Sequence, residues 1–169
     1  MTGTVVGLAA AIFIPMIAEA LVAARHERAQ LARGGVEPDA DVYRAMRIIY
    51  PGAFALMLVE LAWRGGPATF VIAAGALLFV FAKALKYWAI ATLGPAWTFR
   101  VIVVPGAPLT HTGPYRFLRH PNYVAVAGEL VGAALMTGSW VAGPAAVLIF
   151  GVLLNKRIAV EERALGRSL

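Results

Sequence analysis

The residues best suited to chemistry lie in one short stretch, from Gly113 to Tyr123, which reads GPYRFLRHPNY. This stretch contains two arginines, two tyrosines, one histidine and one asparagine, and an apolar segment begins directly after it. Polar groups at the edge of an apolar segment can hold a charged molecule beside a hydrophobic one. The stretch therefore indicates a site that handles both kinds of molecule.

Pro121 predicts that a helix begins at the end of this stretch, because proline is tolerated in the first turn of a helix. His120 and Asn122 would then lie at the helix start, where free backbone N–H groups favour anions such as carboxylate or phosphate. The alternative is that Arg119 and Tyr123 only anchor the chain at a membrane interface.

Two adjacent acidic residues, Glu161 and Glu162, lie further along the chain. Apolar residues on both sides of Ser139 predict two helices that fold back on each other as a hairpin. His120 lies 19 residues before Ser139 and Glu161 lies 22 residues after it, so both return to the same end of the hairpin at about 1.5 Å per residue. We therefore expect the histidine and the acidic pair to meet.

Two further charged positions each fit more than one interpretation. Arg157 and Glu161 lie four residues apart on one helix face, which suits either a shared site or an ordinary surface ion pair. Glu129 lies seven residues after Asn122 on the same face of the predicted helix. Because carboxylates within a membrane usually face a cavity or a partner, Glu129 either lines a polar cavity, where it contacts the substrate, or pairs with another helix.

The segment 94–121 cannot be one helix, because it contains seven glycines and prolines before His120. Residues 97–104 are β-branched and aromatic, which favours an extended conformation. Backbone outside regular structure can present N–H groups to a ligand. An ordinary surface loop is the alternative, although the length and aromatic content of the segment argue against a simple linker.

Composition indicates the kind of protein that must position these residues. The chain is 60% hydrophobic and only 14% charged, against about 25% charged residues in soluble domains. We therefore expect an all-α integral membrane protein with about five transmembrane helices in a single domain. The last two predicted spans are short and form the helical hairpin, with one broken helix or a re-entrant pair as the alternative. The predicted spans are 4–24, 46–63, 67–90, 122–138 and 140–155.

Basic residues predict how the chain is oriented. Fourteen of the 15 lysines and arginines fall on one side of this arrangement, and only Arg64 falls on the other. The positive-inside rule then places the N-terminus outside, with the C-terminus and the polar stretch in the cytoplasm. Lys83 and Lys86, near the end of the third span, are expected to extend toward the interface. This placement explains the net charge of +6 without a nucleic-acid partner.

Other side chains exclude some chemistry or predict packing. The chain has no cysteine, which excludes thiolate catalysis and cysteine-ligated metal centres. Its three histidines lack metal-ligand spacing, so no metal is expected. Gly128 and Gly132 form a pair of small residues that permits another helix to approach closely.

Three groups of residues together resemble the isoprenylcysteine carboxyl methyltransferase family, integral membrane enzymes that use S-adenosylmethionine. The groups are Gly113-Pro114-Tyr115, then Arg119-His120-Pro121-Asn122-Tyr123, then Arg157 with Glu161-Glu162. The resemblance covers about residues 94–165. The Arg-His-Pro-x-Tyr string alone is less specific, because membrane sterol reductases carry a similar string. An NADPH-dependent membrane reductase is therefore one alternative, and a non-catalytic membrane scaffold or carrier is another.

The resemblance implies a cofactor site between residues 107–123 and a C-terminal helix, within a half of the chain (94–169) that follows three N-terminal transmembrane helices (1–93). It implies transfer of a methyl group to a carboxyl or hydroxyl group of a lipophilic or prenylated substrate at the cytoplasmic face of the inner membrane. Arg157 matches an arginine that orients the acceptor, and Arg157 and Glu161 are the implied catalytic residues. The implied contacts of S-adenosylmethionine and its product S-adenosylhomocysteine are Leu109, Thr110, Tyr115, His120, Pro121, Asn122, Tyr123 and Glu161.

Overall fold

The computed structural model describes residues 2–39 and 41–166, which form five α-helices and two short 3-10 helices. The predicted all-helical class is confirmed. Two 3-10 helices, η1 (Gly94–Ala96) and η2 (Gly113–Arg116), interrupt the segment between the third and fourth α-helices. The α-helices are α1 (Thr2–Ala32), α2 (Tyr43–Arg64), α3 (Thr69–Leu93), α4 (Pro121–Thr137) and α5 (Ala142–Ala164).

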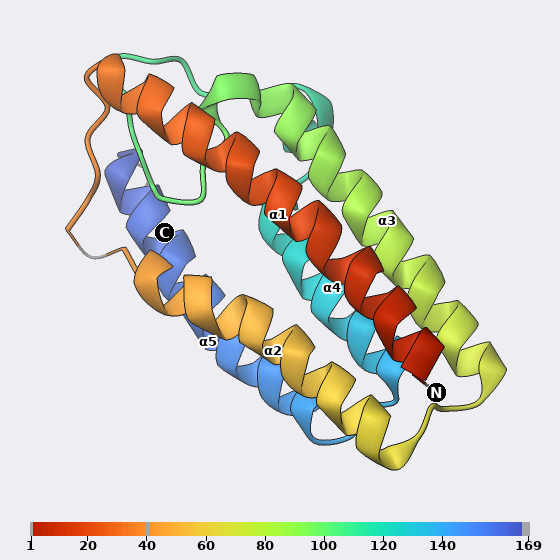
Figure 1. Cartoon of the computed structure of the whole chain (residues 1–169). Coiled ribbons are helices and arrows are strands. Elements are labelled where there is room, and N and C mark those ends of the chain that lie inside the picture. Colours follow the sequence, from red (N-terminus) through yellow and green to blue (C-terminus); the bar gives the residue numbers. More distant parts are fainter. Residues whose placement is uncertain (1, 40, 167–169) are drawn as a thin grey trace.

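The helices run side by side as an elongated bundle (Figure 1). Four of them, α1, α2, α3 and α5, are long and apolar enough to cross a membrane. Together with the hydrophobic composition of the chain, these helices indicate a membrane protein. Helix α4 has 17 residues and is about 26 Å long at about 1.5 Å per residue. It packs along α3 in the most extensive contact between any two elements.

Glycines allow α3 and α4 to approach this closely. A Cβ atom at Gly75 would lie 2.7 Å from the carbonyl oxygen of Gly132, and one at Gly132 would lie 2.9 Å from that of Gly75. A Cβ at Gly128 would meet the Ala82 side chain at 3.0 Å. The predicted close approach at Gly128 and Gly132 is therefore confirmed, and Gly75 is its counterpart on α3.

Helices α4 and α5 form the predicted hairpin. Gly138 adopts a left-handed conformation (φ 63°) after α4, as helix C-caps commonly do. The Ser139 hydroxyl donates to the backbone carbonyl of Met57 on α2, 3.1 Å away, which holds the turn. The predicted fifth span (140–155) and the predicted C-terminal helix are one element, because α5 continues unbroken to Ala164. The polar residues after 155 mark the end of the apolar stretch but not the end of the helix.

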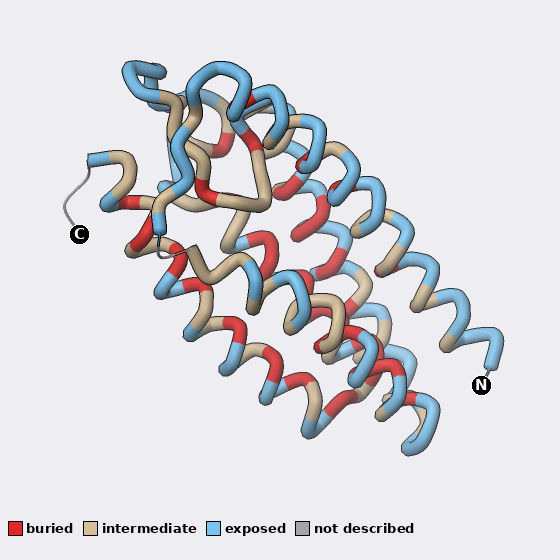
Figure 2. The backbone as a smooth tube through the Cα atoms, turned by 60° about the vertical axis from the view of Figure 1, so that its left-hand side comes forward, coloured by how far each residue is buried: buried red, intermediate tan, exposed pale blue. Residues whose placement is uncertain are grey.

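Burial is uneven among the helices (Figure 2). Buried residues of all five α-helices form one hydrophobic core, to which α2, α4 and α5 contribute most and which includes Phe54, Leu130 and Phe150. Helix α1 is mostly exposed, and its buried residues are Ile12, Glu19, Ala23 and Gln30. It therefore covers one side of the bundle without being enclosed by it.

A buried charge network links four helices near their middle. Lys83 of α3 lies 2.7 Å from Glu19 of α1, and Lys86 lies 2.7 Å from Glu129 of α4. The cross pairs are nearly as short, at 3.2 Å for Lys86 and Glu19 and 3.3 Å for Lys83 and Glu129. The Tyr50 hydroxyl of α2 donates to Glu129. The expectation that Lys83 and Lys86 extend toward the interface was wrong, because buried carboxylates hold both inside the bundle.

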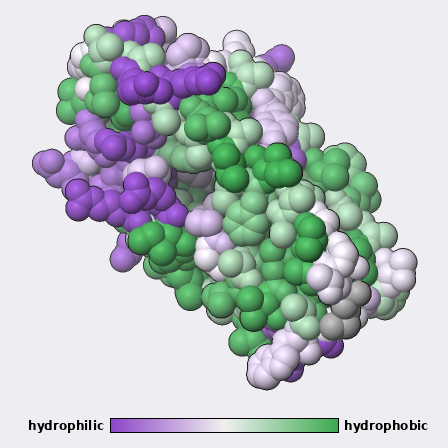
Figure 3. Space-filling view, viewed as in Figure 1, coloured by the Kyte–Doolittle hydropathy of each residue, from purple (hydrophilic) through white to green (hydrophobic). Residues whose placement is uncertain are grey.

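Polar side chains gather at one end of the molecule. Figure 3 shows hydrophilic surface at the end where α1 ends, and largely hydrophobic surface along the helices. In Figure 1 the same end holds the start of α2, the end of α5 and the long segment between α3 and α4. This is the end at which the sequence predicted a site.

Candidate functional site

A cavity of about 590 Å³ lies at the polar end of the bundle and extends inward between the helices. Arg157 and seven of the eight predicted cofactor contacts line it. The exception is Pro121, which is buried at the first position of α4 and fixes the helix start. The seven are Leu109, Thr110, Tyr115, His120, Asn122, Tyr123 and Glu161.

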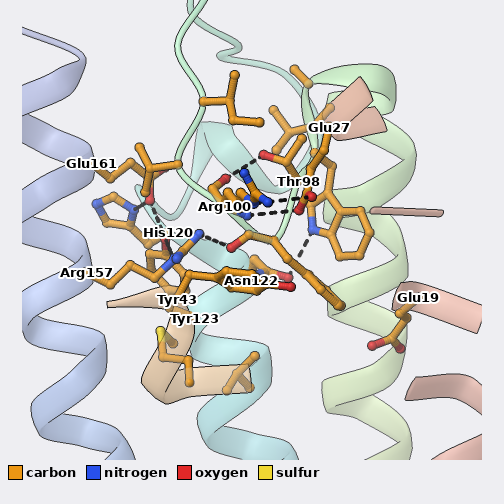
Figure 4. Close-up of a pocket in the computed structure, with 18 of the residues that line it drawn as sticks. Glu19, Glu27, Tyr43, Thr98, Arg100, His120, Asn122, Tyr123, Arg157 and Glu161 are labelled. Atoms are coloured by element: carbon orange, nitrogen blue, oxygen red, sulfur yellow. Dashed lines mark hydrogen bonds and ion pairs between the residues drawn. The ribbon is translucent and has the colours of Figure 1, made fainter. Parts of the chain in front are cut away.

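The predicted meeting of the histidine and the acidic pair is confirmed. Figure 4 shows His120 beside Glu161. His120 Nε2 lies 2.8 Å from Glu162 Oε1, and His120 Nδ1 lies 3.9 Å from Glu161 Oε2. The His120 ring stacks on that of Tyr123 at 5.4 Å between centroids. Helix α4 begins immediately after His120, so this imidazole lies at the helix start as expected.

Tyr123 connects the acidic pair to Arg157. Its hydroxyl donates to Glu161 and accepts a hydrogen bond from Arg157 Nε at 3.0 Å. Arg157 and Glu161 share one face of α5 as predicted, and the phenol of Tyr123 lies between them. The surface ion pair considered as an alternative is not what the structure shows, because Arg157 is 5% exposed.

Arg157 is held by two further groups. Its Nη1 lies 2.8 Å from Asp41 Oδ1, and its Nη2 donates to the carbonyl oxygen of Phe99. Asp41 lies between α1 and α2, far from Arg157 in sequence. The contact therefore joins the first inter-helix segment to α5.

Residues 97–112, which we call the strap, cross the polar end of the bundle over the cavity. The Trp97 indole donates to Asn122 Oδ1 at 3.3 Å, and Val103 pairs with Val36 in an antiparallel bridge. Space here is tight, since a Cβ at Gly35 would lie 2.6 Å from the Ile102 side chain. Residues 97–104 lie outside the helices as predicted, with this single bridge as their paired part.

Two groups near the strap have shifted pKa values. The pKa of Arg100 is raised, because its guanidinium hydrogen-bonds Glu37 at 2.8 Å and Glu27 adds a second negative charge. Burial raises the pKa of the Tyr115 phenol, and the nearby charge of Glu161 raises it further. Both groups therefore keep their protons at neutral pH, and Tyr115 presents a neutral hydroxyl at the cavity.

Glu129 is not among the residues that line the cavity. It is 1% exposed and pairs with Lys83 and Lys86, so of its two interpretations the structure shows the paired interhelical contact. Lys86 and Glu19 of the same network do line the cavity. In Figure 4, Glu19 lies apart from the cluster formed by His120 and its neighbours.

The inner part of the cavity is mainly apolar. Side chains from α1, α2, α4 and α5 form its wall, with the network residues as the charged exceptions. The cavity thus joins a polar end, rich in hydrogen-bonding groups, to an apolar interior that fits a hydrocarbon chain. The apolar lining includes Phe13, Met16, Met46, Val126, Phe150 and Leu154.

Sequence reasoning missed one residue of this cluster, Asp41. Glu162, which contacts His120 directly, was expected there as a member of the acidic pair, although it was not among the predicted cofactor contacts. Asp41 had a weak signal, because an acidic residue before a predicted helix usually caps that helix. Only the folded chain brings Asp41 to Arg157.

Comparisons with known proteins give one family match and two bacterial relatives. The model of the isoprenylcysteine carboxyl methyltransferase family matches residues 75–167. The chain is 28% identical over 159 residues to the uncharacterized protein YpbQ of Bacillus subtilis, covering 94% of each chain. It is 23% identical over 145 residues to an uncharacterized protein of Haemophilus influenzae, covering 85% of this chain and 84% of that one. No solved structure gives a significant match.

Proposed function

Because the chain belongs to the isoprenylcysteine carboxyl methyltransferase family, we propose that it transfers a methyl group from S-adenosylmethionine to a carboxyl or hydroxyl oxygen of a lipophilic molecule. The observation that carries the proposal is the cavity that joins the His120, Tyr123 and Glu161 cluster to an apolar interior. A charged cofactor and a hydrophobic acceptor can meet within one such cavity.

The side chains at the polar end fit the charges of S-adenosylmethionine. Its amino group needs an anion, and the Glu161 carboxylate lines the cavity with a side chain that is 30% exposed. Its carboxylate needs hydrogen-bond donors or a positive potential, and His120 with the start of α4 provides both. Leu109, Thr110 and Tyr115 would contact the remainder. When bound, the cofactor supplies an electrophilic methyl group on a positively charged sulfur.

Arg157 is suited to hold the acceptor oxygen. Its guanidinium lines the cavity and is fixed by Tyr123, Asp41 and Phe99, so it does not need to reorganise when a ligand binds. Fixed orientation of two reacting groups is the main contribution that a protein makes to a direct transfer. The apolar wall next to Tyr123 would hold the hydrocarbon part of the acceptor.

The protein's groups have different tasks for the two kinds of acceptor. A carboxylate acceptor is already an anion, and Arg157 only needs to orient it. A hydroxyl acceptor must also lose a proton, and the Tyr123 hydroxyl, which donates to Glu161, offers a path to a carboxylate. We place this reaction at the cytoplasmic face of the membrane, since the polar end of the bundle carries most of the basic residues.

Methyl transfer can be tested directly. Detergent-purified protein should transfer tritium from methyl-labelled S-adenosylmethionine to an organic-soluble product when supplied with N-acetyl-S-farnesylcysteine, 4-dodecylphenol or dodecanoate. The Glu161→Gln variant should lose methyl transfer. The control variant Arg64→Met should retain it, because Arg64 lies at the end of α2 that is remote from the cavity. Binding of NADPH in place of S-adenosylmethionine would instead support a reductase. A folded protein that binds neither would support a scaffold.

A further inference from the structure

Asp41 is a buried carboxylate that contacts three separate parts of the chain. Its Oδ1 accepts from Arg157 Nη1 at 2.8 Å and from the backbone N–H of Tyr43 at 3.0 Å. Its Oδ2 accepts from the backbone N–H of Val101 in the strap at 2.9 Å. The side chain is only 5% exposed, so each contact is shielded from water. Asp41 lies outside the segment that the family model matches.

These contacts decide which donors of Arg157 remain for a ligand. A guanidinium carries five N–H groups in a fixed plane. Arg157 Nε donates to Tyr123, one Nη1 hydrogen to Asp41 and one Nη2 hydrogen to Phe99. One N–H remains on each terminal nitrogen without a protein acceptor among the described residues, and the side chain lines the cavity. Guanidinium donors of this kind suit an oxygen-bearing ligand group.

Asp41 and Arg157 also set the position of the strap together. Arg157 binds the carbonyl of Phe99, and Asp41 binds the N–H of Val101, two residues further on. The ion pair therefore holds the strap backbone through one carbonyl group and one N–H group. Displacement of either partner would change both the plane of the guanidinium and the strap above the cavity.

We propose that Asp41 is a positioning residue for the methyl acceptor: it fixes the Arg157 guanidinium so that its two remaining N–H groups face the acceptor oxygen. This inference rests on the proposed function. Asp41 does not line the cavity, so it acts through Arg157 and not by direct contact with the acceptor. Its loss should impair acceptor binding far more than cofactor binding, because the cofactor contacts of His120 and Glu161 do not involve it.

The Asp41→Asn variant tests this with little change in shape. An amide cannot accept from both Arg157 and Val101, because its nitrogen is a donor. With the acceptor that gives product in the tritium assay, the variant should raise the acceptor KM about tenfold, which corresponds to about 1.4 kcal/mol. Its Kd for S-adenosylhomocysteine should stay within about twofold of the wild-type value. Glu37→Gln is the matched control, because Glu37 also joins this segment to the strap, through Arg100, but does not touch Arg157.

A second readout needs no acceptor. In nitrogen-15 NMR spectra, the Nη–H signals of Arg157, identified by their absence in Arg157→Lys, should be protected from exchange in the wild type and in Glu37→Gln, because Asp41 accepts from Nη1. Asp41→Asn should lose that protection. Unchanged protection, or equal losses of cofactor affinity and acceptor affinity, would overturn the positioning role and leave the proposed function intact. A wild-type protein with a protected arginine but no binding of S-adenosylhomocysteine would instead overturn the proposed function.

Discussion

Removal of one charge from the buried network should destabilise the protein strongly. Glu129→Gln deletes one of two carboxylates that together balance Lys83 and Lys86. The four residues are between 1% and 9% exposed, so the remaining excess positive charge would have little access to water. Loss of one partner of a buried pair typically costs about 3–5 kcal/mol. At about 2–4 °C per kcal/mol for a chain of this size, Tm should fall by about 6–20 °C.

A second substitution should recover much of this loss. The double variant Glu129→Gln with Lys86→Met restores equal numbers of positive and negative charges, and neutral replacement of a buried pair is often nearly neutral in stability. We therefore expect the double variant to have a higher Tm than Glu129→Gln alone. Arg64→Met is the control, because the Arg64 side chain is 54% exposed, and it should change Tm little.

The assay is thermal unfolding of each variant in the same detergent, followed by the fluorescence of the native tryptophans. The single variant Lys86→Met is measured as well. If the Tm of the double variant falls by the sum of the two single-variant decreases, the reasoning is refuted, because independent contributions would mean that the four charges do not act as one network. A Glu129→Gln variant as stable as the wild type would refute it as well.

Two further outcomes follow from the packing and from the site. Gly132→Val should lower Tm more than Val131→Ala does, because a Cβ at Gly132 would lie 2.9 Å from the Gly75 carbonyl oxygen, whereas Val131 is exposed. Thermal unfolding checks this, and equal losses would contradict it. Tyr123→Phe removes a hydroxyl that lines the cavity and holds the Glu161 carboxylate, so the affinity for S-adenosylhomocysteine should fall about tenfold, at a cost near 1.4 kcal/mol. Calorimetry measures this affinity, and an unchanged value would contradict the role given to the Tyr123 hydroxyl.

Several features of the fold followed from local signals in the sequence. Pro121 marked the start of α4, and the apolar residues around Ser139 marked the hairpin. Together they were sufficient to predict that His120 meets the acidic pair, because the rise per residue of two antiparallel helices determines where their ends lie.

Other features depended on which partners face each other across the bundle. Lys83 has the same local sequence signature whether it extends to the interface or points inward, and only Glu19 and Glu129 on neighbouring helices decide between the two. Likewise, nothing close to Asp41 in sequence reveals Arg157. Such contacts lie between distant segments, and hydrophobic periodicity carries no information about them.

Binding of S-adenosylhomocysteine to the detergent-purified protein, measured by calorimetry, tests the central claim most directly. We predict micromolar affinity for the wild type, retained affinity in Arg64→Met, and loss of measurable binding in Glu161→Gln at unchanged helical content. No binding by folded wild-type protein, or equal affinity in Glu161→Gln, would contradict the assignment of this cavity to the methyl donor.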